Sequence, residues 1–256
     1  MLATYAFGNP DNPTLLMVHG LFGSARNWRA IAKRMSAALH VVTVDMRNHA
    51  GSFHSDEMTY AAMAEDLAEV IQQIGAPVAV MGHSMGGKAV MVLAMTRPQL
   101  ISKLIVADIA PVTYTHDQTP NIDAMEALDL SILQKRSDAD AALKAHLDDP
   151  GLRAFFLQSL SFDGDRPAWL LNLKALRRSM PDILAFPEMS AQFAGPSLFV
   201  TGAQSDYMTP AHKTVTRRHF PAARFVAIKD AGHWLHADQP RAFVATLQAA
   251  TKSLLG

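Results

Sequence analysis

The sequence lacks cysteine altogether, which excludes disulfide bonds and thiolate metal ligands and leaves the redox compartment open. It also lacks an excess of charge of either sign, because 23 Lys and Arg residues balance 23 Asp and Glu residues. A chain of zero net charge has no overall field to attract nucleic acid or an anionic membrane. The composition therefore argues against both classes of partner.

Long hydrophobic runs are absent as well, since no apolar stretch approaches the roughly 20 residues that span a bilayer. Residues 1–5 carry neither the basic segment nor the apolar run of a secretory signal. We therefore expect a cytoplasmic protein. Apolar residues as such are plentiful: with 256 residues, 49% of them hydrophobic, the chain can bury the core of one domain.

The segment from Val78 to Gly87 is the most informative part of the chain. Its first residues, Val-Ala-Val-Met, are typical of a strand buried on both faces, and residues 88–97 are typical of a helix that ends before Pro98. Between them, Gly-His-Ser-Met-Gly fits the pattern G-x-S-x-G. Strand, pentapeptide and helix together predict a nucleophile elbow with Ser84 on a strained turn. A plain glycine-rich turn is the alternative interpretation.

Apolar runs and amphipathic segments alternate through most of the chain. The predicted strands are residues 14–18, 40–44, 78–81, 101–107, 197–201 and 224–228. The predicted helices between and after them are residues 27–39, 59–74, 88–97, 211–219 and 240–255. This alternation predicts an α/β fold, with a mostly parallel central sheet and helices on both faces.

The alternation stops at residues 112–193, where helical stretches are separated by Pro and Gly and no clear strand is visible. Residues 139–147, preceded by a Ser-Asp pair suited to capping, and residues 169–178 are predicted to be helices. We therefore expect an α/β core made of residues 1–111 and 194–256, with the intervening residues inserted as a helical lid.

A serine nucleophile needs a base within hydrogen-bond reach, because its hydroxyl is scarcely ionised at neutral pH. His233 lies in the loop after the final predicted strand and follows a glycine, whereas the side chain of His83 should point away from its neighbour Ser84. An Asp then orients the imidazole. Asp108 and Asp206 both lie at strand ends between Ser84 and His233, so either satisfies a known chain order of a serine triad.

Two pairs of histidines suggest metal ligands, but neither is complete. His233 and His236 are three residues apart without a third ligand, and His49 and His54 have no carboxylate or thiolate at a matching spacing. Hydrogen bonds that stabilise a loop explain His49 and His54 better. We predict neither a metal nor a cofactor.

A His-Gly turn follows the first of these predicted strands, within residues 19–24. In serine hydrolases built on such a sheet, this turn supplies one N–H group of the oxyanion hole. The candidate donors are the backbone N–H groups of Leu21 and of Met85, the residue after the nucleophile. An ordinary strand-to-helix turn is the alternative.

Ring-bearing side chains beside these motifs and in the expected lid are candidates for the wall of a substrate pocket. Leu170 and Leu173 in the lid could line this pocket as well. For all the lid residues, the alternative is that they only pack the lid helices together. The candidates are Phe22, His83, Phe155, Phe156, Trp169 and Trp234.

The chain resembles the α/β-hydrolase superfamily, and within it the small lidded bacterial carboxylesterases with the strings H-G-L-F-G-S, D-M-R-N-H-G-x-S and G-H-S-M-G-G-K. Here these stand at residues 19–24, 45–52 and 82–88. The chain departs from them at Ala50, where the family has glycine, and its own glycine comes one place later at Gly51. If the turn needs a positive φ at this position, Ala50 is strained.

The resemblance also bears on the choice of acid. The usual acid of the superfamily lies three residues after the glycine that ends the penultimate strand; counted from Gly202, this is Ser205, and Asp206 comes one residue later. The esterases resembled here draw their acid from the place of Asp108, and a serine at the later position helps to tether the histidine. We therefore hypothesise that Asp108 is the acid, with Asp206 as the alternative and Ser205 as a tether of His233.

The resemblance implies a serine carboxylesterase that hydrolyses short- to medium-chain acyl esters of small molecules, and acyl thioesters in some members. On the same fold, a carbon–carbon bond hydrolase and a cofactor-free perhydrolase are alternatives. From another class, a ligand-binding receptor with a hydrolase-like pocket is an alternative. The sequence predicts no particular oligomeric state.

Overall fold

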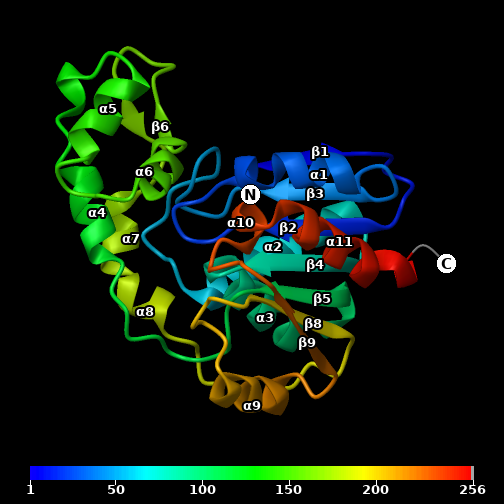
Figure 1. The fold of residues 1–256 in the computed structure, drawn as a ribbon. Helices are drawn as coiled ribbons and strands as arrows, with labels where there is room; N and C mark the ends of the chain where they lie inside the picture. The colour runs from blue at the N-terminus through cyan, green and yellow to red at the C-terminus, as the bar shows by residue number, and fades with distance from the viewer. Residues whose placement is uncertain (255–256) are drawn as a thin grey trace.

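The computed structural model describes residues 1–254. Within them the strands are β1 (Thr4–Phe7), β2 (Thr14–Val18), β3 (His40–Val44), β4 (Val78–His83), β5 (Ile101–Ala107), β6 (Leu160–Ser161), β7 (Ala168–Trp169), β8 (Ser197–Gly202) and β9 (Ala223–Ile228). In this part of the chain, seven strands form one sheet of order β1-β3-β2-β4-β5-β8-β9 (Figure 1). Strand β1 runs antiparallel to β3, and the other neighbours in the sheet are parallel. The predicted mostly parallel sheet is confirmed.

The helices surround this sheet and also form a separate lobe (Figure 1). The α-helices are α1 (Arg29–Met35), α2 (Tyr60–Ile74), α3 (Met85–Thr96), α4 (Thr119–Glu126), α5 (Arg136–Leu143), α6 (Pro150–Leu157), α7 (Leu173–Arg178), α8 (Met180–Leu184), α9 (Pro210–His219), α10 (Leu235–Asp238) and α11 (Pro240–Thr251). The short 3₁₀ turns are η1 (Ala25–Trp28), η2 (Pro98–Leu100), η3 (Leu130–Ile132) and η4 (Lys252–Leu254).

The described helices include none that is both long enough and apolar enough to cross a membrane. The cytoplasmic location expected from the sequence stays a prediction.

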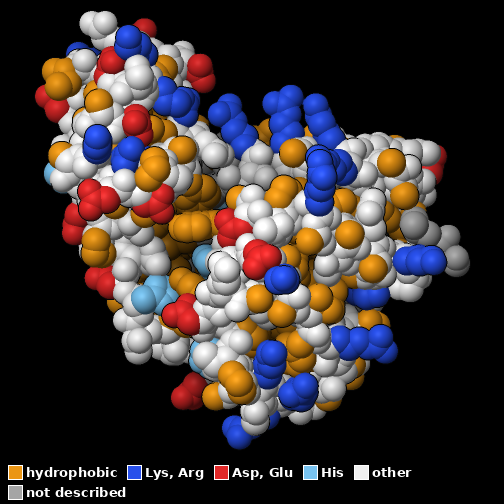
Figure 2. Space-filling model, viewed as in Figure 1, with side chains coloured by type: hydrophobic (Ala, Val, Ile, Leu, Met, Phe, Trp, Pro, Cys, Tyr) orange, Lys and Arg blue, Asp and Glu red, His pale blue; other side chains and the backbone are white. Residues whose placement is uncertain are grey.

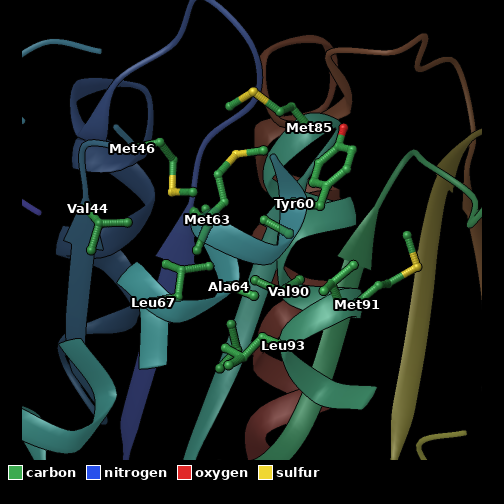
Figure 3. Close-up of a cluster of buried hydrophobic side chains, with 14 of the residues drawn as sticks. Val44, Met46, Tyr60, Met63, Ala64, Leu67, Met85, Val90, Met91 and Leu93 are labelled. Atoms are coloured by element: carbon green, nitrogen blue, oxygen red, sulfur yellow. The ribbon is translucent and has the colours of Figure 1, made fainter. Parts of the chain in front are cut away.

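Hydrophobic side chains on both faces of the sheet hold the layers together. On one face, α2 and α3 pack over the strands in a cluster that includes Val44, Met63, Leu67, Val90 and Leu93 (Figure 3). On the other face, α1 and α11 cover a second cluster. Residues Met85 to Met95 of α3 are all buried, as expected for a helix with neighbours on every side. The elbow therefore stands on the most deeply packed helix of the core.

Between β5 and β8 the chain leaves the sheet and forms the lobe that carries α4 to α7 in Figure 1. We call residues 112–193 the insertion. It has a small hydrophobic cluster of its own, which includes Leu143 and Leu160, and it also adds Phe156 and Ile183 to the cluster over α2 and α3. The insertion is thus packed against the core as well as within itself.

Several details of the predicted elements are wrong. The edge strand β1 was not expected, and the insertion contains the antiparallel strand pair β6–β7. Segment 27–39 is helical only as η1 and the shorter α1, and segment 169–178 becomes helical only at Leu173. Helix α5 begins three residues before the predicted start and ends at Leu143. The predicted helix 240–255 is α11 followed by η4, and residue 255 lies outside the described part of the chain.

Candidate active site

Ser84 stands on the sharp turn between β4 and α3. Its backbone has φ 52° and ψ −121°, a conformation that residues with a side chain rarely adopt. A Cβ atom on Gly82 would lie 2.3 Å from the carbonyl oxygen of Gly86, and one on Gly86 would lie 2.3 Å from that of His19. Both glycines are required because α3 starts so close to β4 and to the end of β2. This is the geometry of the predicted nucleophile elbow.

Three side chains from distant parts of the chain meet at this turn. His233 Nε2 lies 3.1 Å from Ser84 Oγ, and His233 Nδ1 lies 2.8 Å from Asp108 Oδ2. Asp108 directly follows β5 and has a positive φ of 49°, which is unusual for aspartate. Its carboxylate is completely buried. Hydroxyl, imidazole and carboxylate therefore form a continuous hydrogen-bonded row.

Ser205 and Asp206 lie in the turn after β8, three and four residues beyond its last residue, Gly202. Ser205 Oγ lies 2.5 Å from Asp108 Oδ2, so its hydroxyl donates to the carboxylate that contacts His233, and its role as a tether of His233 stays a prediction. The other carboxylate oxygen, Oδ1, accepts the N–H of Gly202 at 3.0 Å. Asp206 is exposed, and no hydrogen bond joins it to His233 within residues 1–254. Its place in the turn points it to solvent.

His83 lies beside this hydrogen-bonded row and contacts the loop that carries His233. Its Nε2 is 2.9 Å from the carbonyl oxygen of His233, and the two rings are 4.8 Å apart. Burial, with a smaller contribution from the neighbouring His233, holds the pKa of His83 well below its usual value. The neutral ring can donate one N–H to this carbonyl and so anchor the backbone of His233.

The N–H groups expected to hold an oxyanion are those of Leu21, in the loop after β2, and of Met85, at the start of α3; neither has an acceptor among residues 1–254. The neighbouring Phe22 has a positive φ of 63° and is held on both sides. Its N–H donates to His49 Nε2 at 3.1 Å, and its carbonyl accepts the hydroxyl of Ser159 from the insertion at 3.2 Å. These contacts hold the backbone beside Leu21, and Met85 is buried at the start of α3.

His49 acts as an acceptor because burial lowers its pKa to about 3, so that the ring is neutral at neutral pH. The hydrogen-bonding role predicted for this loop is thus seen for His49, whose Nδ1 also lies 2.9 Å from the carbonyl oxygen of Arg47. The next residue, Ala50, has a positive φ of 45°. The strain considered for Ala50 is therefore present, in a turn where the resembled family has glycine.

A cavity of about 330 Å³ lies over Ser84, with walls from the core and from the insertion. Figure 2 shows a hollow in this region, bordered mainly by hydrophobic side chains with histidine at its edge. Trp169 does not line the cavity: its indole N–H donates to the carbonyl of Met125 within the insertion. Of the other pocket residues expected from the sequence, the cavity is lined by Phe22, His83, Phe155, Phe156 and Trp234.

Sequence reasoning missed several polar residues of the cavity wall, among them Tyr60, Lys88, Tyr114 and Tyr207. For Lys88 a signal was available, because it follows Ser84 by four residues and so lies one helical turn along the same face of α3. The tyrosines come from α2, from the start of the insertion and from the loop after β8. No local pattern marks them.

His236 does not pair with His233 around a metal site. Its ring packs 4.7 Å from that of Trp28 and 5.0 Å from that of His83, and burial lowers its pKa to about 4. Within the described residues, no group of three His, Asp or Glu side chains is placed to hold a metal ion. His236 thus belongs to a cluster of packed rings that includes Trp28 and His83.

Comparison with known proteins gives a consistent result. Residues 15–246 match the model of the alpha/beta hydrolase family. The chain is 39% identical over 246 residues to the sn-1-specific diacylglycerol lipase ABHD11 of Mus musculus, an alignment that covers 93% of this chain and 80% of the relative. It is 37% identical over 243 residues to Esterase YbfF of Escherichia coli (strain K12), covering 93% of this chain and 92% of the relative.

Among solved structures, the chain is similar to a marine microorganism esterase, with a TM-score of 0.93 and 34% sequence identity over 97% of this chain and 98% of the other. The fold, the sequence relatives and this structure agree on one assignment. The chain belongs to the α/β hydrolase family and is an esterase-type hydrolase.

Proposed function

We propose that the protein is a serine carboxylesterase in which Ser84 is the nucleophile, His233 the base and Asp108 the acid that orients it. The observation that carries this proposal is the unbroken row of hydrogen-bond contacts from Ser84 Oγ through both nitrogens of His233 to the buried Asp108. A buried carboxylate next to Nδ1 fixes the tautomer whose Nε2 accepts the serine proton.

In the acylation step, Ser84 Oγ attacks the ester carbonyl carbon while its proton passes to His233 Nε2. The negative charge that develops on the carbonyl oxygen is stabilised by the N–H groups of Leu21 and Met85, the latter at the amino end of α3. The tetrahedral intermediate then expels the alcohol, which takes the proton from His233. The acyl group remains on Ser84 as an ester.

In the deacylation step, water gives a proton to the same nitrogen of His233 and attacks the acyl carbon. The second tetrahedral intermediate collapses, the carboxylic acid leaves, and the proton returns to Ser84. The buried carboxylate of Asp108 stabilises the imidazolium in both halves of the cycle. Ser205 and Gly202 hold that carboxylate in place through their hydrogen bonds to its two oxygens.

The size and lining of the cavity support a small-molecule ester with a short to medium acyl chain. A volume of about 330 Å³ is near the lower end of the roughly 300–1,000 Å³ typical of ligand sites. Phe155, Phe156 and Trp234 provide apolar surface beside the nucleophile. In this proposal the insertion serves as a lid, and its closed wall limits acyl length.

The test is a panel of esters and thioesters of one alcohol or thiol graded by acyl length, assayed with wild type and with Ser84→Ala. We expect wild-type kcat/KM to be highest for short to medium chains and turnover to be abolished in the variant. Retained turnover in Ser84→Ala would remove the proposed nucleophile. An optimum at long-chain triglycerides would contradict the proposed acyl pocket.

A further inference from the structure

Tyr207 lies face to face with the proposed base. The centroids of its ring and of the His233 imidazole are 3.8 Å apart, and the two planes are inclined by only 17°. Tyr207 comes from the loop between β8 and α9, whereas His233 comes from the loop after β9. The stack therefore joins two loops at the carboxyl end of the sheet.

The Tyr207 ring is fixed from several directions. Its hydroxyl lies 3.0 Å from His116 Nε2, at the start of the insertion. Its carbonyl accepts the hydroxyl of Tyr114 at 2.7 Å, and its N–H donates to Ser205 Oγ at 3.3 Å. Because Ser205 also donates to Asp108, one network holds both the acid and the ring that covers the base. The backbone contacts fix the place of Tyr207, and its ring cannot turn away from His233 without breaking the contact of its hydroxyl with His116.

We propose that Tyr207 is a positioning residue that fixes the imidazole plane of His233 and stabilises the imidazolium formed during turnover; this rests on His233 being the base. An aromatic face carries negative charge density and attracts a cation placed over it, more so where water is excluded. The imidazolium exists only while the serine or water proton is held. The attraction therefore favours the transition states over the resting enzyme and acts on kcat.

The other groups around His233 leave this role to the tyrosine ring. Asp108 balances the positive charge at Nδ1, and His83 bonds to the backbone carbonyl of His233 while its ring, tilted by 40°, lies 4.8 Å from the imidazole. Burial keeps the pKa of His83 well below its usual value, and that of His236 at about 4, so both are neutral near pH 7. His116 is held at the far end of the Tyr207 ring, on its hydroxyl, and burial lowers its pKa.

Tyr207 itself is neutral as well, because burial raises the pKa of its phenol to about 12. The surface that covers the imidazole is therefore an uncharged aromatic face throughout the working range of pH. A ring without the hydroxyl should serve nearly as well as tyrosine.

The experiment compares Tyr207→Phe, which keeps the ring, with Tyr207→Leu, which keeps apolar volume without a ring. Steady-state kinetics on a short-chain p-nitrophenyl ester should show kcat lowered on the order of tenfold in Tyr207→Leu, with KM unchanged within about twofold. Tyr207→Phe should keep kcat within about threefold of wild type. Circular dichroism and thermal denaturation check folding, and Tyr207→Met replaces the leucine variant if that one does not fold.

Three results would overturn the inference: an equal loss of kcat in the phenylalanine and leucine variants, a higher KM with unchanged kcat, or wild-type kcat in Tyr207→Leu. The first would assign the effect to the hydroxyl and the second to substrate contact. Ser84→Ala is assayed in parallel. If it is inactive while Tyr207→Leu keeps full kcat, only the inference on Tyr207 fails; if Ser84→Ala is fully active, the proposed function fails.

Discussion

At the scale of single residues, backbone strain is concentrated where the chemistry is proposed to occur. Within residues 1–254, every residue other than glycine with a positive φ follows the carboxyl end of a strand of the sheet. Each such conformation costs on the order of 1–3 kcal/mol and persists only where the surroundings enforce it. These residues are Phe22, Asn48, Ala50, Ser84, Asp108 and Asp230.

The first prediction at this scale separates the two candidate acids. Asp108→Asn should lower kcat on the order of 10⁴-fold, because an amide beside Nδ1 no longer selects the tautomer that accepts the serine proton. Asp206→Asn should keep kcat near that of wild type, since this exposed side chain does not contact His233. Steady-state kinetics on one ester at neutral pH measure both.

Asp206→Asn is the matched control, because it makes the same chemical change directly between Ser205 and Tyr207, at an exposed side chain that takes no part in their hydrogen bonds. The opposite pattern, with near-normal turnover in Asp108→Asn and a large loss in Asp206→Asn, would assign the acid to Asp206.

At the scale of elements, the strands of the core could be predicted almost completely from the sequence. Strands buried on both faces are continuous apolar runs, and the predicted ranges 14–18, 40–44 and 101–107 coincide with β2, β3 and β5. Strand β1 was missed because its residues are largely exposed and have no such run. In the insertion, segments too short for a clear period gave wrong helix limits and hid β6 and β7.

The candidate site divides in the same way. The nucleophile, its glycines and the loop of His233 stand in local motifs that the sequence displays. The direction in which Ser205 points depends on the exact conformation of the turn after β8. The stack of Tyr207 on His233 depends on how the loops after β8 and β9 meet. Contacts between distant loops leave no local pattern, so they become visible only in the structure.

Lys88 links two elements, α3 of the core and α8 of the insertion. Its Nζ donates to the carbonyls of Leu184 and Ala185, at 2.8 and 2.7 Å, at the carboxyl end of α8. It also lies over the rings of Tyr114 and Tyr60, at 4.9 and 5.7 Å. No carboxylate pairs with Lys88 in the described part of the chain, and burial lowers its pKa to about 7. A buried cation thus holds the last turn of α8 to the core.

The second prediction follows from this depressed pKa. Between about pH 7 and 10.5 the unfolded chain keeps the Lys88 proton while the folded protein loses it, so the free energy of unfolding should rise with pH by up to about 1.4 kcal/mol per unit. Lys88→Met removes this contribution. In urea denaturation at pH 7, 8 and 9, the free energy of unfolding of wild type should therefore increase relative to that of Lys88→Met as the pH rises.

The exposed Lys33 on α1 provides the control, since Lys33→Met should follow wild type at each pH. A stability difference between wild type and Lys88→Met that stays constant from pH 7 to 9 would contradict the prediction and show that Lys88 remains charged in the folded protein.

At the scale of the whole molecule, the zero net charge hides an uneven distribution of titratable groups. Four histidines surround the site on separate elements: His19, His49 and His83 are buried, and His236 is half-buried. Burial lowers the pKa of each, to about 4 for His19 and His236 and about 3 for His49, and well below the usual value for His83. All four are neutral at pH 7 and take part in packing or hydrogen bonds that suit the neutral ring.

The third prediction is that the folded protein loses stability steeply on mild acidification. Below about pH 6.5 the unfolded chain binds protons on these histidines while the folded protein does not, so the free energy of unfolding falls with pH, by at most roughly 5 kcal/mol per unit for the four together. Urea denaturation at pH 7, 6 and 5 measures this slope above the range where most carboxylates titrate.

The variant His49→Gln tests the contribution of one ring, because its amide oxygen can still accept the N–H of Phe22. Its slope of unfolding free energy against pH should be shallower than that of wild type by up to about 1.4 kcal/mol per unit. The control His146→Gln, on the exposed surface of the insertion, should keep the wild-type slope. A flat profile from pH 7 to 5, or equal slopes in the two variants, would show that the buried rings accept protons without unfolding and would contradict the neutral state on which the proposed oxyanion loop depends.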